Sequence, residues 1–147
     1  QMVIVASDLI VSSYKNRLVS LAADSGRLLW FKDISSAGGV VVDRIRLAVS
    51  DKEDNLWMLD RRNGSTTWKV DRMSNRGLTR PAFYGNYVVV GDMEGYLHWL
   101  DSDLGAFVAR VRAGKKGFAA APLTVGTTLY VLTKKGALVA YRAGAAI

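Results

Sequence analysis

Short runs of apolar residues, each about the length of a β-strand, recur along the whole chain. In the clearest stretch they occupy residues 80–84, 87–91, 96–100 and 106–111. Turn residues such as Gly85-Asn86 and Asp92-Met-Glu-Gly95 separate these runs. No segment has a 3.6-residue apolar period, so the pattern predicts a protein built almost entirely of strands.

This unit of short strands is repeated along the chain. The leucines near the start of its third strand, Leu18, Leu56, Leu97 and Leu138, are 38, 41 and 41 residues apart. A fixed period of this size predicts an array of supersecondary units, and four-stranded antiparallel units are typical of propeller blades. We therefore expect residues 1–147 to form one all-β propeller segment, with four blades at about 1–35, 36–74, 75–113 and 114–147.

The other copies predict similar strands. In the first copy they are 3–6, 9–13, 18–22 and 27–32, in the second 39–42, 45–50, 55–60 and 66–70, and in the fourth 122–125, 128–133 and 137–142. Most of the strands are apolar on both faces, as expected for sheets packed between two neighbours. No strand pattern follows residue 142, so the last blade is expected to lack its outer strand, leaving an unpaired edge at 137–142.

A recurring turn followed by tryptophan is the main structural motif. Its residues are Gly26, Trp30, Asp60, Gly64, Trp68, Asp101 and Gly105. The aspartate can accept hydrogen bonds from nearby backbone N–H groups, and the glycine can adopt a positive φ. The tryptophan, on the outer strand, is expected to lie over the turn of an adjacent blade. In the third copy Ala109 replaces it, so that contact is expected to be weaker or differently filled.

Composition excludes several kinds of chemistry. The chain has no cysteine, which excludes disulfides, thiolate metal sites and cysteine nucleophiles. Its net charge of +7 raises the question of nucleic acid. The basic residues, including Arg61 and Arg62, fall at predicted turns without interleaved aromatics, so we interpret them as solvated hairpin tips and expect no nucleic-acid partner.

The candidates for catalysis and metal binding have structural interpretations. His98, the only histidine, lies within a predicted strand, and no partner for it is evident in the sequence. It is expected to be a packed, hydrogen-bonded residue. The acidic groups at 51–54 and 101–103 coincide with repeat turns and lack the ligand pattern of a calcium loop. We therefore expect no catalytic residue, cofactor site or metal site.

The motif Asp60-Arg-Arg-Asn-Gly-Ser-Thr-Thr-Trp68 resembles the tryptophan-docking repeat of PQQ-like eight-bladed propellers. This resemblance leaves open an alternative function, a fragment of a quinone-dependent dehydrogenase. Such enzymes hold their quinone with a vicinal cysteine pair, a calcium ion and a catalytic aspartate. The absence of cysteine argues against that alternative, and a likeness of fold does not establish an active site.

A sharper resemblance is carried by Gly91-Asp-Met-Glu-Gly-Tyr-Leu-His-Trp-Leu100. Together with the motifs in 78–86 and 105–109, the pair Gly117-Phe118 and the turn at 134–136, it is similar to the BamB family of outer-membrane assembly lipoproteins. The resemblance corresponds to the C-terminal half of that family, four blades of eight. It implies a non-enzymatic scaffold of the β-barrel assembly (BAM) machinery on the periplasmic side of the outer membrane. The remaining alternative is a generic periplasmic binding propeller.

The same resemblance implies partners. BamB-like proteins bind the periplasmic POTRA domains of BamA and assist unfolded β-barrel substrates. The loops that make the BamA contact and the lipid-bearing cysteine lie upstream of residue 1 in that family, so the chain, which begins at Gln1, is interpreted as part of a longer protein. Half of a ring would expose two apolar blade faces, and a homodimer would cover both. The alternative is that the chain closes on itself as a compact four-bladed propeller.

Overall fold

The computed structural model describes residues 1–13, 15 and 17–144. It contains fifteen strands in four antiparallel sheets, each built from strands that are consecutive in the chain. Every described element is a strand or turn, and the described residues include no helix that could cross a membrane. The all-β prediction is therefore confirmed.

The first two sheets have four strands each. The first contains β1 (Met2–Val5), β2 (Asp8–Ser12), β3 (Leu18–Ala22) and β4 (Leu28–Lys32). The second contains β5 (Ser36–Val42), β6 (Arg46–Asp51), β7 (Leu56–Asp60) and β8 (Thr66–Val70).

The third sheet has four strands and the last has three. The third contains β9 (Ala82–Tyr84), β10 (Tyr87–Gly91), β11 (Tyr96–Asp101) and β12 (Phe107–Arg112). The last contains β13 (Leu123–Val125), β14 (Thr128–Leu132) and β15 (Leu138–Tyr141). The shorter last sheet was predicted. Residues 143 and 144 form no strand, and the part of that prediction that concerns 145–147 lies outside the described residues.

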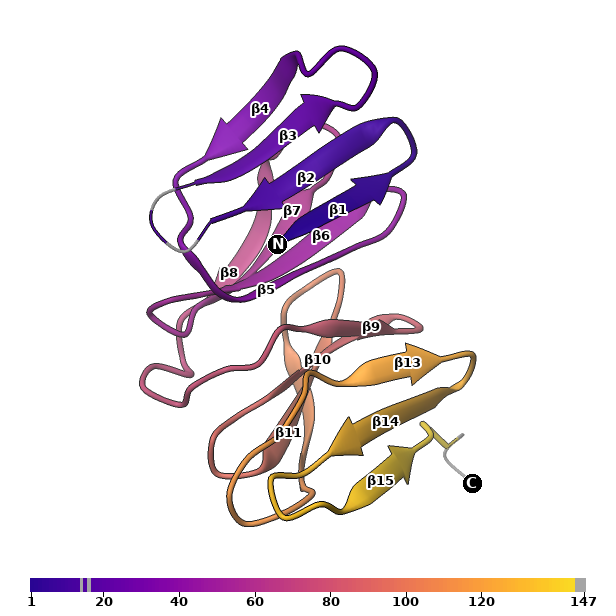
Figure 1. Cartoon of the computed structure of the whole chain (residues 1–147). Coiled ribbons are helices and arrows are strands. Elements are labelled where there is room, and N and C mark those ends of the chain that lie inside the picture. Colours follow the sequence, from indigo (N-terminus) through magenta and orange to yellow (C-terminus); the bar gives the residue numbers. More distant parts are fainter. Residues whose placement is uncertain (14, 16, 145–147) are drawn as a thin grey trace.

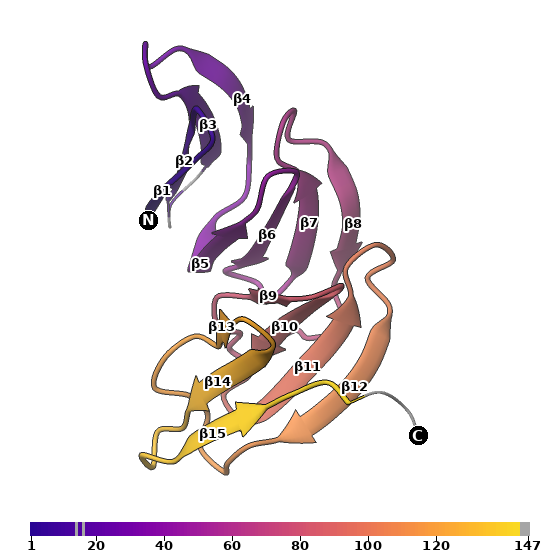
Figure 2. The same ribbon diagram turned by 90° about the vertical axis from the view of Figure 1, so that its right-hand side faces the viewer.

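The sheets follow one another in a curved stack (Figures 1 and 2), as expected when twisted sheets pack face to face. The outer strands β4, β8 and β12 lie along one side of the stack in Figure 2, and β9 contacts β13 near the other. This is the arrangement of neighbouring propeller blades. It places each outer strand beside the turns of the following sheet.

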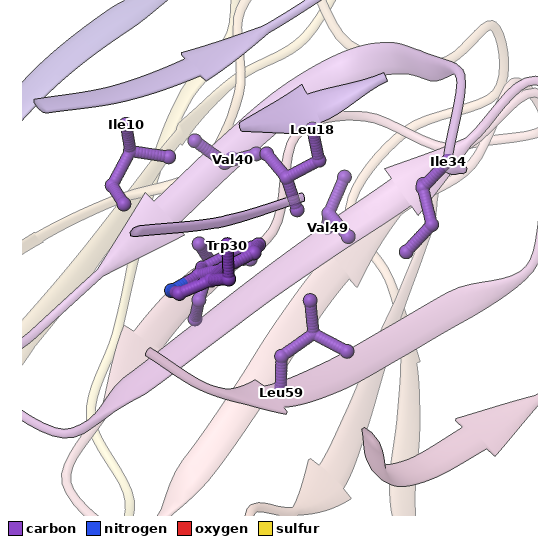
Figure 3. Close-up of a cluster of buried hydrophobic side chains, with 8 residues drawn as sticks. Ile10, Leu18, Trp30, Ile34, Val40, Val49 and Leu59 are labelled. Atoms are coloured by element: carbon purple, nitrogen blue, oxygen red, sulfur yellow. The ribbon is translucent and has the colours of Figure 1, made fainter. Parts of the chain in front are cut away.

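Three apolar clusters fill the three spaces between consecutive sheets. The first contains Ile10, Leu18, Trp30, Ile34, Val40, Leu47, Val49 and Leu59 (Figure 3). The second contains Ala48, Leu56, Met58, Met73, Leu78, Val88, Val90 and Leu100. The third contains Ala82, Tyr84, Val89, Leu97, Trp99, Phe118, Leu129 and Val131. The two middle sheets supply side chains to a cluster on each face, which is why their inner strands β6, β7, β10 and β11 are largely apolar and buried.

The two terminal sheets each leave one face open. On the first sheet Met2 and Ile4 are 73% and 70% exposed, and on the last sheet Leu138 is 70% exposed. Leu123 and Val125 are also exposed on the last sheet. These open faces have the apolar character of the covered ones.

Two strand starts differ from the sequence-based expectation by more than one residue. β5 begins at Ser36 instead of residue 39, because an irregularity in its pairing lies between Ser36 and Gly39. There the N–H of Gly39, at φ +108°, donates to the Ser36 hydroxyl at 2.9 Å. β9 begins at Ala82 instead of residue 80, and Pro81, which has no N–H to donate, lies outside the ladder.

Candidate functional site

The joints between consecutive sheets are the features that the repeat motif builds. At the first joint Trp30 of β4 is 8% exposed and packs among side chains of both sheets (Figure 3). Its indole N–H donates to the backbone carbonyl of Arg61 at 2.8 Å. Its ring covers Gly64, where a Cβ atom would lie 2.6 Å from the ring and φ is +75°. The turn after β7 therefore requires glycine both for its backbone conformation and for the approach of the indole.

The second joint repeats this geometry one blade later. The indole N–H of Trp68 donates to the carbonyl of Ser102 at 2.8 Å. The ring covers Gly105, where φ is +70° and a Cβ would lie 2.7 Å away. By contrast, Gly26, with φ +71°, has no atom within 4 Å of the place its Cβ would take. In the first blade the glycine thus serves only its own turn within the described chain.

The aspartates of the motif organise these turns. Asp60 accepts the N–H of Arg62 at 2.9 Å, and Asp101 accepts those of Asp103 and Leu104 at 2.8 and 3.0 Å. Hydrogen bonds from Arg62, first from its side chain and then from its N–H, lower the pKa of Asp60 below its ordinary value. These carboxylates shape turns, which is how the sequence analysis interpreted the acidic groups. No group of three His, Cys, Asp or Glu side chains placed to hold a metal occurs among the described residues.

The third joint uses a different strand for its indole. Trp99 on β11 lies directly opposite Ala109 on β12. At the equivalent register the first two blades have Ser20 opposite Trp30 and Met58 opposite Trp68. The large side chain has thus exchanged places with the small one across the strand pair, and the joint is differently filled.

The Trp99 ring packs edge-on against two tyrosines. Its centroid lies 5.3 Å from that of Tyr84 and 6.3 Å from that of Tyr87. Its buried indole N–H has no hydrogen-bond partner among the described residues, in contrast to those of Trp30 and Trp68. The third joint therefore lacks the indole hydrogen bond of the first two joints. Other groups bond across it instead: the Tyr84 hydroxyl donates to the carbonyl of Thr127, and the Thr124 hydroxyl donates to that of Phe83.

Arg61 corrects a sequence-based interpretation. The sequence predicts a solvated hairpin tip at this residue, but Arg61 is only 6% exposed. Its guanidinium donates to the carbonyl of Arg44 at 2.8 and 2.7 Å and pairs with the carboxylate of Asp8 in the first sheet. Its own carbonyl accepts the Trp30 indole, so both ends of the residue hold the first two sheets together. Arg62 is exposed, as expected.

His98 is buried and hydrogen-bonded, and the structure identifies its partner. His98 Nε2 lies 2.8 Å from Oδ2 of Asp92, which is fully buried. The other oxygen of Asp92 accepts the N–H groups of Glu94 and Tyr96, and Arg76 lies 3.1 Å from Oδ2. Burial acts to raise the pKa of Asp92, but the hydrogen bonds from His98, Tyr96 and Glu94 outweigh it and lower the pKa.

The equivalent turn of the second blade shows what this pair does. There Asp51 accepts the N–H groups of Glu53 and Asn55 with one oxygen, and the Trp57 indole N–H with the other at 2.8 Å. His98 occupies the position of Trp57, a side chain that does not titrate. The shared role is to donate a hydrogen bond to the turn aspartate, which is a structural role.

The comparisons with known proteins agree with this geometry. A family profile described as "Outer membrane protein assembly factor BamB" matches residues 1–70. A protein of that name from Xanthomonas campestris pv. campestris is 40% identical over 134 residues, covering 91% of this chain and 33% of the relative. The one from Pseudomonas aeruginosa is 41% identical over 133 residues, covering 90% and 35%. The chain thus spans about a third of the length of the curated relatives it matches.

Solved structures show the same fold. The crystal structure of BamB from Moraxella catarrhalis aligns with a TM-score of 0.88 at 22% identity, covering 97% of this chain and 42% of that one. The computationally designed Ika4 protein aligns with a TM-score of 0.82 at 13% identity, covering 97% and 89%. Quinohemoprotein alcohol dehydrogenase from Comamonas testosteroni is more distant, with a TM-score of 0.64 at 18% identity and coverage of 76% and 20%. In sequence the chain is similar to proteins named as outer membrane protein assembly factor BamB, and in fold it is an array of propeller blades like that of the Moraxella catarrhalis structure.

Proposed function

We propose that the chain supplies blades to a non-enzymatic scaffold subunit of the BAM machinery, which assists the folding and insertion of β-barrel proteins at the periplasmic side of the outer membrane. The observation that carries the proposal is the 40% identity, over 91% of the chain, to a protein named as an outer membrane protein assembly factor. The role of a scaffold fits a molecule whose organised side chains serve the joints between blades.

We propose a non-enzymatic role because the buried aspartate and histidine side chains are already engaged in structural hydrogen bonds. The buried pair of Asp92 and His98 is engaged in holding a turn, and the same hydrogen bond is made by Trp57 in the neighbouring blade. A general acid or base must instead reach a substrate proton. A dehydrogenase fragment is therefore the weaker alternative, supported by a distant likeness of fold alone.

The proposed partners are the POTRA domains of BamA, bound through the full-length protein, and unfolded β-barrel substrates. We expect purified POTRA domains to retain the full-length protein in a pull-down, whereas an unrelated periplasmic domain of similar charge does not. Failure of the full-length, folded protein to bind would contradict the assembly role. It would favour the alternative of a periplasmic binding propeller that belongs to another complex.

The open apolar faces of the two terminal sheets support a second proposed partner of this chain, which is another copy of itself. Met2 and Ile4 on one face and Leu138 on the other resemble residues that the inner joints bury. Two copies related by a two-fold axis would cover both faces of each. We expect light scattering of the chain to give the mass of a dimer at high concentration. A monomer throughout the concentration range would contradict this proposal.

A further inference from the structure

A cationic hollow lies on the outer rim between the second and third sheets. It has a volume of about 410 Å³ and is lined by Arg72, Met73, Arg76, His98, Phe107, Val108, Ala109 and Arg110. Three of these residues are arginines and none is an acid, although Asp92 beside them bonds to Arg76 and His98. Counted together, these groups leave two positive charges unbalanced.

The loop that carries two of the arginines is held in place. Asp54 accepts the N–H groups of Gly77 and Leu78 at 3.0 and 2.9 Å. Met73 is 2% exposed and belongs to the second apolar cluster, and the carbonyl of Arg76 accepts the N–H of Met93 at 2.8 Å. The arginines are thus presented from an ordered backbone, which reduces the entropy cost of binding.

The opposite wall of the hollow is equally fixed. Arg110 on β12 lies in register with His98 on β11, and its guanidinium is 4.7 Å from the centroid of Tyr96. The ring of Phe107 packs edge-on against His98 at 6.3 Å. Phe107 and Val108 remain 41% and 54% exposed, so apolar surface adjoins the cationic groups.

The equivalent hollow between the first and second sheets provides an internal comparison. It has a volume of about 290 Å³ and is lined by Lys15, Asp33, Ile34, Ser35, Asp51, Lys52, Glu53, Trp57 and Lys69. There three lysines and three acids share the lining, and one of the acids, Asp33, also pairs with Arg17. Lys69 occupies the position of Arg110, in register with Trp57 and 4.6 Å from its ring centroid. Of these two hollows, the second therefore has the larger excess of positive charge in its lining.

We propose that the hollow lined by Arg72, Arg76 and Arg110 binds a carboxylate side chain of an acidic polypeptide segment, with Phe107 and Val108 contacting an adjacent apolar residue of the same segment. Arginine is the side chain best suited to bind a carboxylate through two parallel hydrogen bonds. The adjoining apolar surface favours a peptide over a small inorganic anion. This site does not depend on the proposed assembly role.

The test is fluorescence anisotropy with a labelled peptide in which valine and threonine alternate, so that all threonines share one face of the extended chain. In this peptide glutamate replaces two consecutive threonines of that face. An identical peptide with glutamine is the charge control. We expect the glutamate peptide to bind more tightly than the glutamine peptide. Arg110→Gln and Arg72→Gln should each weaken its binding about fivefold, the effect of a partly exposed ion pair.

The matched control is Lys69→Gln, at the equivalent position of the neutral hollow, which should leave the affinity unchanged. Far-UV circular dichroism establishes whether each variant is folded. If Arg110→Gln does not fold, Arg72→Gln, on an exposed loop, provides the test of the arginine contribution. Equal binding of the two peptides, or equal weakening by Lys69→Gln, would overturn the proposal. Displacement of the peptide by vesicles of phosphatidylglycerol, with the same dependence on Arg110, would assign the hollow to a membrane surface and also overturn it.

Discussion

Replacing Trp30 with alanine is expected to lower the free energy of unfolding by about 3–5 kcal/mol, the range for removing a buried aromatic side chain. The indole belongs to the first apolar cluster, covers Gly64 and donates to the Arg61 carbonyl. Its loss leaves a cavity between two sheets and an unpaired carbonyl. Urea unfolding followed by far-UV circular dichroism measures the effect, because tryptophan fluorescence would itself change with the substitution.

Two further variants separate the contributions to this loss. Trp30→Phe keeps much of the packing but removes the indole N–H, so a smaller loss of about 1–2 kcal/mol is expected. Leu28→Ala, on the same strand but 53% exposed, should change stability by only about 0.5 kcal/mol. If Trp30→Ala were no more harmful than Leu28→Ala, Trp30 would not be holding the first joint.

Arg61→Ala is expected to cost about 3 kcal/mol, because it removes one partner of a largely buried ion pair. The Asp8 carboxylate, whose side chain is only 18% exposed, would lose its cation, and the Arg44 carbonyl would lose two donors. The neighbouring Arg62 provides the matched control, since its side chain is 65% exposed and pairs only with Asp60 two residues away.

Arg62→Ala should therefore change the free energy of unfolding by less than about 0.5 kcal/mol. A double-mutant cycle of Arg61→Ala with Asp8→Ala measures the coupling between the sheets directly, and we expect that coupling to be at least about 1 kcal/mol. Equal effects of the two arginine substitutions, or additive effects in the cycle, would show that Arg61 does not join the first sheet to the second.

The repeat made much of this architecture predictable from the sequence. Its period gave the sheets, and the turn glycines together with Trp30 and Trp68 indicated that outer strands contact a neighbouring blade. These features are local: a turn and the strand beside it lie within a few residues of one another. The three-stranded last sheet of the described residues followed from the same comparison of copies.

The features that escaped prediction depend on pairing in three dimensions. Arg61 and Arg62 are adjacent in sequence, and only the approach of Asp8 from another sheet distinguishes the buried one. The exchange of Trp99 with Ala109 becomes evident only when β11 is aligned with β12. The sequence does contain a signal for this exchange. Trp99 occupies the repeat position of Ser20 and Met58, so the blade that has alanine on its outer strand has tryptophan at the facing position.

His98 illustrates the same limit in another form. Its partner Asp92 is only six residues away, across one hairpin turn. The equivalent pair in the second blade, Asp51 and Trp57, contains no histidine, so the shared hydrogen bond is concealed by the change of residue type. Comparing the copies by the function of each position, instead of by residue identity, would have identified the pair.

The most direct test of how the blades are joined is hydrogen exchange at the four tryptophan indole N–H groups, measured by NMR on the ¹⁵N-labelled protein. We expect the indoles of Trp30 and Trp68 to be strongly protected, because each donates to a carbonyl of the following sheet. In Gly64→Ala the added Cβ would clash with the Trp30 ring, so this substitution should remove the protection of the Trp30 indole and leave that of Trp68 largely intact. Exchange of both indoles at the rate of free indole in the unsubstituted protein would contradict the account.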